Sequence, residues 1–313
     1  MKWLALAALV ACVKGQSVID MHVDLAHAAY TGARFDDPAG EVTRDKLARG
    51  RVQWLVLPLF VESAYRKPPS RVRDEYEATW RALTALEVPT RTTLAFEGAD
   101  GFADDARGID RWFARGVCVV GLVHDRDNAL AGSSTDPASP QPGRSLTAAG
   151  RALAERVIDD GGILDVAHAS DASAAELIQI AKGRGAIAID SHTGMRTLAQ
   201  SRRNLSDEAA HALAETDGVV AISMHSGHVG RTPGEPATLD DVASHIEYAV
   251  SILGASHVAI GSDFDGLIVP PIGSDGEATW PALVATLERR GMKPTVLRAV
   301  LHDNAARVLG RCR

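Results

Sequence analysis

Short apolar segments alternate with longer amphipathic segments along this chain, and eight of the apolar segments have the length of β-strands. Most of them are continuous apolar runs, which is typical of parallel strands covered on both faces. The pattern predicts strands over residues 17–24, 52–60, 92–97, 117–123, 163–167, 186–190, 218–224 and 257–262. Eight parallel strands that alternate with helices predict an α/β fold of the (β/α)8 TIM barrel type.

The amphipathic segments carry the start and stop signals of helices. Ser206 precedes two acidic residues, a combination that favours a helix start. Ser145 is expected to open a helix that ends before Gly161 and Gly162, because glycine commonly follows the last turn. The predicted helices are residues 71–87, 146–160, 171–182, a segment starting at 205–208, 238–253, 281–290 and 294–309.

Residues that can bind a metal follow six of the eight predicted strands. Enzymes with this fold carry their chemistry at the C-terminal ends of the strands, so these side chains should meet at one mouth of the barrel. A single histidine there would mean little, and we interpret His27, His211, His245, His257 and His302 as core or surface residues. The candidate set comprises His22 and Asp24, Glu97, His124, His168, His192 and Asp263.

The residue types in this set predict a metal centre. His22 and Asp24 are two positions apart, and on a strand such residues point to the same face. Asp263 follows the last strand, which neighbours the first in a closed barrel, and Glu97 has two oxygens that could bridge two ions. Nitrogen and oxygen ligands without thiolates suit Zn²⁺, while Mn²⁺, Co²⁺ and Fe²⁺ remain open. Two ions about 3.5–4 Å apart would polarise a carbonyl and activate a bridging hydroxide.

Composition and charge narrow the classes of function. The chain has 313 residues, 46% of them hydrophobic, and a net charge of −7 without a basic stripe, which argues against a nucleic-acid partner. Its length would allow two domains. However, the most linker-like segment, residues 132–143, directly follows a predicted strand end, and we interpret it as a loop over the site. We therefore predict one catalytic domain over residues 17–313.

The first sixteen residues form a separate unit. A positive charge followed by a short apolar run predicts a signal segment over residues 1–16, and the residues before Cys12 are typical of a lipoprotein signal, which makes Cys12 a candidate lipid anchor. We therefore expect the protein to be exported to the periplasm or anchored at a membrane surface. The alternative is a cytoplasmic protein whose apolar N-terminus packs on the barrel. Three cysteines are too few for a disulfide framework, and Cys118 is interpreted as a small buried apolar residue.

Several motifs in order resemble the membrane dipeptidase (renal dipeptidase) family of zinc metallopeptidases, within the amidohydrolase superfamily. The resemblance extends from about residue 18 to 309. It rests on residues 20–25 (DMHVDL), 96–98 (FEG), 121–124 (GLVH), 164–170 (LDVAHAS), 191–193 (SHT), 201–207 (SRRNLSD), 261–266 (GSDFDG) and 304–308 (NAARV).

The resemblance implies a function and a role for each site residue. Members of this family are zinc-dependent barrels that cleave dipeptides, tolerate a D-residue on the C-terminal side and in some cases open β-lactams; they often form dimers. By analogy, two Zn²⁺ ions would be bound by His22, Asp24 and Asp263, by the bridging Glu97, and by His168 and His192. His124 would contact the substrate carbonyl, Arg203 would bind the free C-terminal carboxylate, and Asp263 would transfer the proton.

The chain departs from the family pattern around the pocket rather than at the ligands. Ala26 and His27 stand where an aromatic residue is often found, the stretch after His124 lacks the usual tryptophan, and His225 and His228 follow strand seven. The leading hypothesis is a binuclear dipeptidase. The alternatives are an amidohydrolase acting on acyl-amino acids, lactones or β-lactams, and a non-catalytic metal-binding surface lipoprotein. Neither the role of His225 and His228 nor the substrate chirality follows from the sequence.

Overall fold

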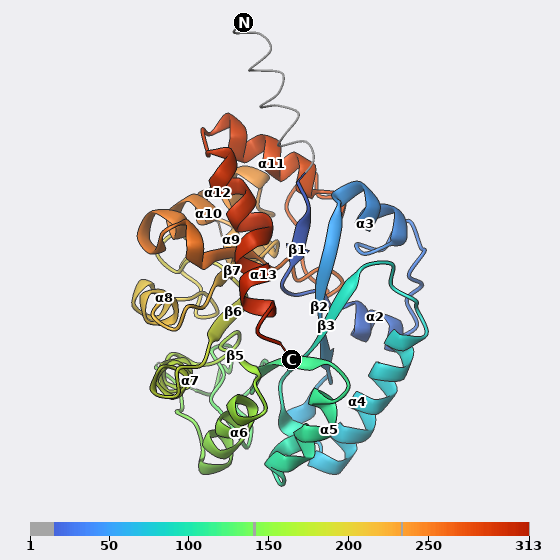
Figure 1. Ribbon diagram of the computed structural model, residues 1–313, viewed down its shortest axis with the longest axis vertical. Helices are drawn as coiled ribbons and strands as arrows, with labels where there is room; N and C mark the ends of the chain where they lie inside the picture. The colour runs from blue at the N-terminus through green and yellow to red at the C-terminus, as the bar shows by residue number, and fades with distance from the viewer. Residues whose placement is uncertain (1–15, 140–141, 233, 313) are drawn as a thin grey trace, which may run out of the picture.

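A single sheet of eight parallel strands forms the centre of the molecule, with the strands in sequence order. The computed structural model describes residues 16–139, 142–232 and 234–312. Its strands are β1 (Val18–Asp20), β2 (Val52–Phe60), β3 (Arg91–Glu97), β4 (Val117–Gly121), β5 (Ile163–Asp165), β6 (Ala188–Thr193), β7 (Val220–Ile222) and β8 (Val258–Ile260). The strands lie at the centre of the molecule and the helices surround them (Figure 1).

Backbone hydrogen bonds bring the last strand against the first. The Met21 N–H donates to the Ile260 carbonyl at 3.0 Å, and the Asp24 N–H donates to the Phe264 carbonyl at 2.8 Å. Each other neighbouring pair of strands is joined by a parallel ladder. The predicted (β/α)8 TIM barrel is therefore confirmed.

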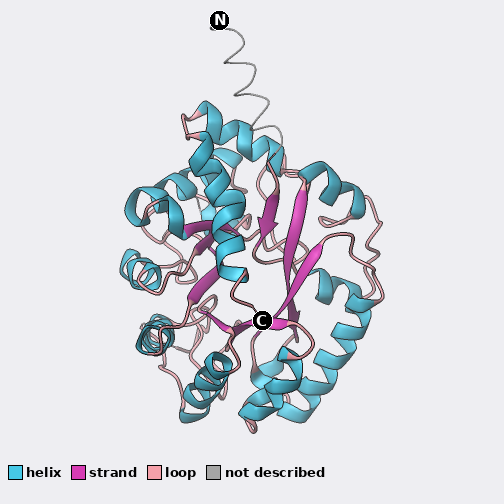
Figure 2. Cartoon of the chain, viewed as in Figure 1, coloured by secondary structure: helices cyan, strands magenta, loops and turns pink. Residues whose placement is uncertain are grey.

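Helices cover the outside of the sheet, as Figure 2 shows. They are α2 (Leu25–Tyr30), α3 (Arg44–Gly50), α4 (Pro69–Thr84), α5 (Asp110–Phe113), α6 (Ala148–Asp159), α7 (Asp171–Gly183), α8 (Asp207–Ala214), α9 (Ser226–Val229), α10 (Leu239–Leu253), α11 (Trp280–Arg289), α12 (Pro294–Arg298) and α13 (Asn304–Leu309). Short 3₁₀ turns occupy Ala64–Arg66, Asp100–Phe102, Ala106–Ile109 and Ala255–His257. Within the described ranges, no helix combines the length and apolarity needed to cross a bilayer.

The predicted helix starts are partly right. Ser206 caps α8, because its hydroxyl accepts from the Ala209 N–H at 3.2 Å. The predicted cap of α6, Ser145, is wrong, since the Gly150 N–H donates to the hydroxyl of Thr147 at 3.1 Å instead. The predicted helix over 294–309 is interrupted, because a π-helical turn at Ala299–Asp303 separates α12 from α13.

Several strands end earlier than predicted, and a buried carboxylate explains the case of β1. The strand stops at Asp20, whose Oδ1 accepts from the His22 N–H at 3.1 Å and from the Ser262 N–H at 2.8 Å. The Asp20 carboxylate thus accepts from residues just beyond both β1 and β8, where a backbone carbonyl would accept if the strands continued. His22 and Asp24 therefore lie on the loop beyond β1 rather than on the strand itself.

The barrel interior is filled and closed at one end. Side chains from the strands meet in an apolar cluster inside the sheet, and α13 adds Ala305, Val308 and Leu309 to the same cluster. In Figure 1, α13 crosses in front of the strands and the C-terminus lies near the centre of the view. A second, larger cluster lies between the strands and the surrounding helices. With this end blocked by α13, the opposite end is left for the site.

A disulfide connects this closing helix to the sheet. Cys118 in β4 and Cys312 after α13 are bonded across 194 residues of sequence. The interpretation of Cys118 as a small buried residue is right about its burial, but the disulfide was not foreseen. The signal segment and the candidate lipid anchor Cys12 lie outside the described residues, and the division of the chain at residue 16 stays a prediction.

Candidate metal centre

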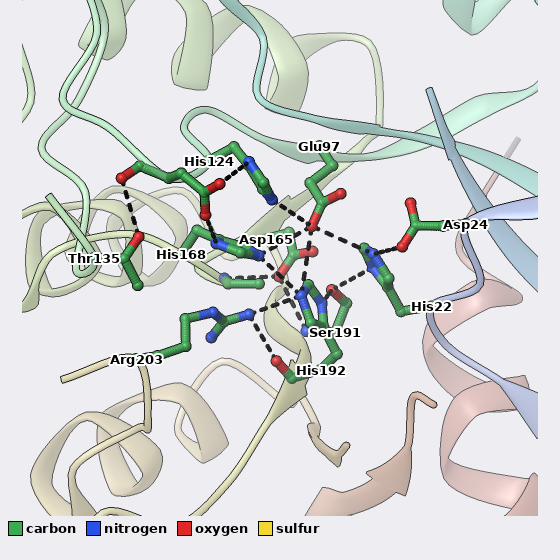
Figure 3. Close-up of polar contacts among 12 residues, drawn as sticks. His22, Asp24, Glu97, His124, Thr135, Asp165, His168, Ser191, His192 and Arg203 are labelled. Carbon is green, nitrogen blue, oxygen red and sulfur yellow. Dashed lines mark hydrogen bonds and ion pairs between the residues drawn. The ribbon is translucent and has the colours of Figure 1, made fainter. Parts of the chain in front are cut away.

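The predicted ligands meet around one carboxylate oxygen at the C-terminal end of the strands. The Oε1 atom of Glu97, the last residue of β3, lies 3.4 Å from His22 Nε2, 3.0 Å from His168 Nε2 and 3.4 Å from His192 Nε2. His124 Nε2 is 3.8 Å from the same oxygen. Figure 3 shows these side chains pointing inward toward Glu97 from different strand ends. The set predicted from the sequence is thus assembled in one place.

The ligand atoms fall into three groups, each with the spacing that a metal ion requires. His22, Asp24 and Asp263 form one group, Glu97 joins His22 and His192 in a second, and Glu97 joins His124 and His168 in a third. Within each group the candidate atoms lie within 4.8 Å of one another. Glu97 belongs to two groups, which agrees with a bridging carboxylate between two ions.

Two of the candidate residues have unusual backbone conformations. His168 has φ 63° and Asp263 has φ 69°, in the left-handed region that non-glycine residues rarely occupy. Hydrogen bonds hold both: the Ser134 N–H donates to the His168 carbonyl at 2.8 Å, and the Asp263 N–H donates to the His22 carbonyl at 2.9 Å. The fold therefore holds these side chains toward the site against a local conformational cost of about 1–3 kcal/mol each.

Hydrogen bonds also determine which histidine nitrogens face the centre. A guanidinium only donates, so Arg203 Nη2, 2.8 Å from His192 Nε2, requires that this nitrogen carry a lone pair. The Ser191 hydroxyl lies 2.9 Å from Nδ1 of His192 and 3.1 Å from Nδ1 of His22. One hydroxyl oxygen can accept from both rings, and Nε2 is then the nitrogen of each ring that faces the centre.

The charges at the centre are poorly balanced without cations. Burial raises the pKa of Asp263 well above the usual aspartate range, and the neighbouring Asp24 carboxylate raises it further. Burial lowers the pKa of His168 well below the usual histidine range, with the charge of Arg203 adding to the effect. Burial likewise lowers the pKa of His192, and His22 adds to it. Burial lowers the pKa of His22, but the Glu97 and Asp24 carboxylates outweigh it and hold that pKa well above the usual histidine range. A proton on this ring therefore offsets part of the negative charge, and a divalent ion would stabilise the repelling Asp24 and Asp263 carboxylates more fully.

Unsatisfied buried atoms give an independent test of this interpretation. Among the described residues, His22 Nε2 and Asp24 Oδ1 are buried and make no hydrogen bond, although Glu97 Oε1 lies 3.4 Å from His22 Nε2. Leaving such atoms unpaired is costly unless a ligand binds them. Both belong to the group that Asp263 completes, so the donor set fits a bound metal.

The remaining predicted residues lie at the edge of the centre. Arg203, on the loop after β6, is 6% exposed and also donates to the His192 carbonyl at 2.8 Å. His124 packs against Phe60 with ring centroids 4.5 Å apart. Both line a cavity of about 560 Å³ together with Asp24, Glu97, His168 and Asp263.

Some contributors were not foreseen from the sequence. Ser191 and Asp125 contact the candidate ligands: Asp125 Oδ2 is 3.4 Å from His124 Nδ1, and its Oδ1 is 3.9 Å from His168 Nδ1. Each is a direct sequence neighbour of a predicted site residue, and this adjacency was the available signal. His225 and His228, whose role was left open, both line the cavity.

Comparison with known proteins identifies the family. Residues 78–313 match the model of the membrane dipeptidase family, peptidase family M19. The chain belongs to this family. The matched segment contains Glu97, His124, His168, His192, Arg203 and Asp263. His22 and Asp24 precede it and are placed at the site by the fold.

Curated relatives agree with this assignment. The chain is 32% identical to the dipeptidase aclJ of Aspergillus oryzae over 78% of its length and 56% of the relative. It is 29% identical to the dipeptidase ataJ of Aspergillus terreus, over 74% and 59% of the two chains. The chain thus spans somewhat more than half the length of these relatives.

Two crystal structures share the fold. A metallopeptidase from Rhodobacter sphaeroides, liganded with a phosphinate mimic of the dipeptide L-Ala-D-Ala, has a TM-score of 0.83 at 20% identity, covering 95% of this chain and 99% of that one. The probable dipeptidase PvdM from Pseudomonas aeruginosa has a TM-score of 0.83 at 20% identity, covering 98% of each chain. At this identity the similarity supports the fold.

Proposed function

We propose that this protein is a metal-dependent dipeptidase that hydrolyses small dipeptides with a free C-terminal carboxylate. The observation that carries the proposal is the convergence of His22, His168 and His192 on the Glu97 carboxylate, with Arg203 beside them. Family membership supports the same activity. The dipeptide mimic bound to the Rhodobacter metallopeptidase is consistent with this class of substrate.

The proposed ligand set divides between two ions, most simply Zn²⁺. His22, Asp24 and Asp263 would hold one, His168 and His192 the other, and Glu97 would bridge them. Two divalent ions supply a water of lowered pKa and polarise the scissile carbonyl. His124, which lies at the cavity edge with its Nε2 toward Glu97, would donate to the carbonyl oxygen as negative charge develops on it.

Asp263 is the proposed proton carrier. A carboxylate beside the attacking water can take its proton and pass it to the nitrogen of the leaving amine. Asp263 is 9% exposed and groups with His22 and Asp24, which supports a position beside the water that it would deprotonate.

The charge pattern of the cavity favours a zwitterionic substrate. The cavity merges with a smaller one of about 200 Å³, and the residues shared by the two include Glu62 and Asp125. It also meets a third cavity through Ser201, His225 and Gly227, and Arg203 lines the shared end of the first. A free dipeptide has an ammonium group for the acidic side and a carboxylate for Arg203. An acyl-amino acid would leave the acidic side without a partner.

The test compares L-Xaa-L-Xaa and L-Xaa-D-Xaa dipeptides with their N-acetylated forms, and metal content is determined on the same sample. We expect free dipeptides to be cleaved, activity to vanish with a chelator and to return with Zn²⁺. Two ions per chain with cleavage of only the N-acetylated forms would replace the proposal by an acyl-amino-acid hydrolase.

The role of Arg203 can be tested by substrate chemistry. Arg203→Ala should lower kcat/KM about 10- to 100-fold for free dipeptides, because a charge-assisted hydrogen-bonded pair is lost. C-terminally amidated dipeptides lack the carboxylate and should be cleaved equally by variant and wild type. Equal losses on both substrates would exclude the carboxylate-binding role.

We also propose that the protein works outside the cytoplasm. The Cys118–Cys312 disulfide supports this location, since such bonds persist mainly in oxidising compartments. Cell fractionation with thiol labelling tests it: a cytoplasmic protein with two free thiols at these positions would exclude export. Lipidation at Cys12 and the homodimer implied by the resemblance stay predictions.

A further inference from the structure

Two histidines of the cavity take no part in the chemistry proposed above. His225 precedes α9 and His228 lies within it, and their rings are in edge contact with centroids 4.7 Å apart. His228 is 7% exposed, and its ring centroid is 6.3 Å from that of His192. Both residues line the cavity that holds Arg203. If the substrate placed only an apolar side chain against His225 and His228, apolar residues would serve equally well at these two positions.

Hydrogen bonding fixes the tautomer of His225. Its Nδ1 accepts from the backbone N–H groups of Gly227 and Val269, each at 3.4 Å. A nitrogen that accepts carries no proton, so the neutral ring has its N–H at Nε2. A Cβ added at Gly227 would lie 2.8 Å from this Nε2, and glycine at 227 therefore keeps the space beside it free.

His228 presents a second donor by a different argument. Its Nδ1 is buried, and no residue of the described ranges hydrogen-bonds to it. Burying a lone pair costs less than burying an unpaired N–H, so the proton is favoured on Nε2. With its proton on Nε2, the ring has one N–H to donate in the cavity that it lines.

These groups give the Arg203 side of the cavity an excess of donors. Arg203 is a buried cation whose guanidinium, among the described residues, hydrogen-bonds only to His192, and its buried Nε has no hydrogen-bond partner. One substrate carboxylate can occupy its fork. The two imidazole donors then remain, beside the opening shared with a neighbouring cavity of about 590 Å³. A second acceptor on the substrate would satisfy them, and a carboxylate is the strongest acceptor among side chains.

We propose that His225 and His228, next to Arg203, form a subsite for a carboxylate on the side chain of the C-terminal residue, so that dipeptides ending in Asp or Glu are favoured. This subsite rests on the dipeptidase activity proposed above. It makes the two histidines specificity-determining residues rather than parts of the metal centre.

The experiment uses the metal-loaded protein and two nearly isosteric substrates, L-Ala-L-Asp and L-Ala-L-Asn. We expect wild type to prefer L-Ala-L-Asp by about tenfold or more in kcat/KM, the range of a charge-assisted hydrogen bond. His228→Phe and His225→Phe should each reduce this ratio toward one, and L-Ala-L-Leu should be cleaved as by wild type. His228→Gln, which keeps an N–H near the Nε2 position, should retain part of the preference.

The controls separate the subsite from the activity on which it rests. His211→Phe, at an exposed position on α8, should leave the Asp-to-Asn ratio unchanged. Cleavage of L-Ala-L-Leu without a preference for Asp would overturn the subsite alone. An equal loss on all three dipeptides in the phenylalanine variants would also overturn it, because the histidines would then serve the main-chain carboxylate. A wild type that binds two metals but cleaves no dipeptide would overturn the activity and the subsite together.

Discussion

At the scale of single residues, the site depends on side chains that each serve more than one partner. Glu97 Oε1 lies within 3.4 Å of three histidine nitrogens. The Ser191 hydroxyl lies within 3.1 Å of Nδ1 in both His22 and His192. Such sharing means that one substitution should affect both halves of the centre.

Ser191 is the clearest case. Ser191→Ala removes the acceptor of both rings, so His22 and His192 lose the partner that orients their Nε2 lone pairs. We expect the affinity for both metal ions to fall about 10- to 100-fold, as is usual when the outer partner of a metal-binding histidine is lost. Competition with a zinc chelator dye measures this without relying on activity.

Ser251→Ala is the matched control for Ser191→Ala, because this serine is exposed on α10 and its hydroxyl donates to the Tyr248 carbonyl of the same helix at 2.7 Å. It should bind both ions as wild type does. If Ser191→Ala also binds two ions with unchanged affinity, the shared hydroxyl does not orient the ligands.

Asp263 is expected to matter for turnover more than for folding. Asp263→Asn keeps the shape of the side chain but cannot accept the proton, so kcat should fall about 10²- to 10⁴-fold. In metal-free protein the same change removes a buried carboxylate that faces Asp24, so the thermal midpoint should not decrease. Full activity in a variant that holds its metals would exclude the proton-transfer role.

At the scale of elements, the loops after the strands are tied to the helices behind them. The loop after β6 carries Arg203 and returns through a bridge between Met195 and Leu205. The Met195 N–H donates to Nδ1 of His245 on α10 at 2.9 Å, and His245 is 2% exposed. The substrate-binding loop is therefore held by an imidazole that must stay neutral in order to accept.

This contact predicts a pH dependence of stability. Burial lowers the pKa of His245 from 6.5 to about 4. The unfolded chain therefore takes up the proton first as the pH falls, and the stabilisation present above pH 6.5 is lost progressively toward pH 4. The full contribution is about 3 kcal/mol.

His245→Asn keeps an acceptor near the Nδ1 position but does not titrate. Urea unfolding of both proteins between pH 7 and pH 4 should show a steeper loss of the free energy of unfolding for wild type than for the variant. Parallel curves would mean that His245 does not contribute to acid sensitivity.

At the scale of the whole molecule, the sequence predicted the features that recur with each strand. It did not predict specific contacts between residues that are far apart in the chain. The barrel and the ligands follow from one rule, that residues after successive parallel strands share one end of the sheet, and His22, Glu97, His168 and Asp263 obey it. The contact between Ser191 and two rings depends on exact side-chain geometry, and serine is too common to stand out. The early end of β1 depends on hydrogen bonds to the Asp20 side chain, which the hydrophobic pattern does not predict.

The Cys118–Cys312 disulfide is the largest feature that the sequence did not reveal. Spacing alone gives no sign of it, because the two residues are 194 positions apart and only the closed barrel brings α13 under β4. The bond fixes the C-terminal end of the chain to the sheet across nearly two thirds of the sequence. It should therefore act on the stability of the whole barrel rather than on the distant site.

Cys312→Ser tests this, since it leaves Cys118 as the small buried residue first assumed. We expect the free energy of unfolding to fall by about 2–5 kcal/mol, the upper end corresponding to the entropy of closing so long a loop in the unfolded chain. A reducing agent should lower the thermal midpoint of wild type to that of the variant, and leave the variant unchanged.

Metal affinity should be equal in both proteins, because α13 and the ligands lie at opposite ends of the barrel. A midpoint insensitive to both reduction and substitution would mean that the strands and α13 close the barrel without help from the bond.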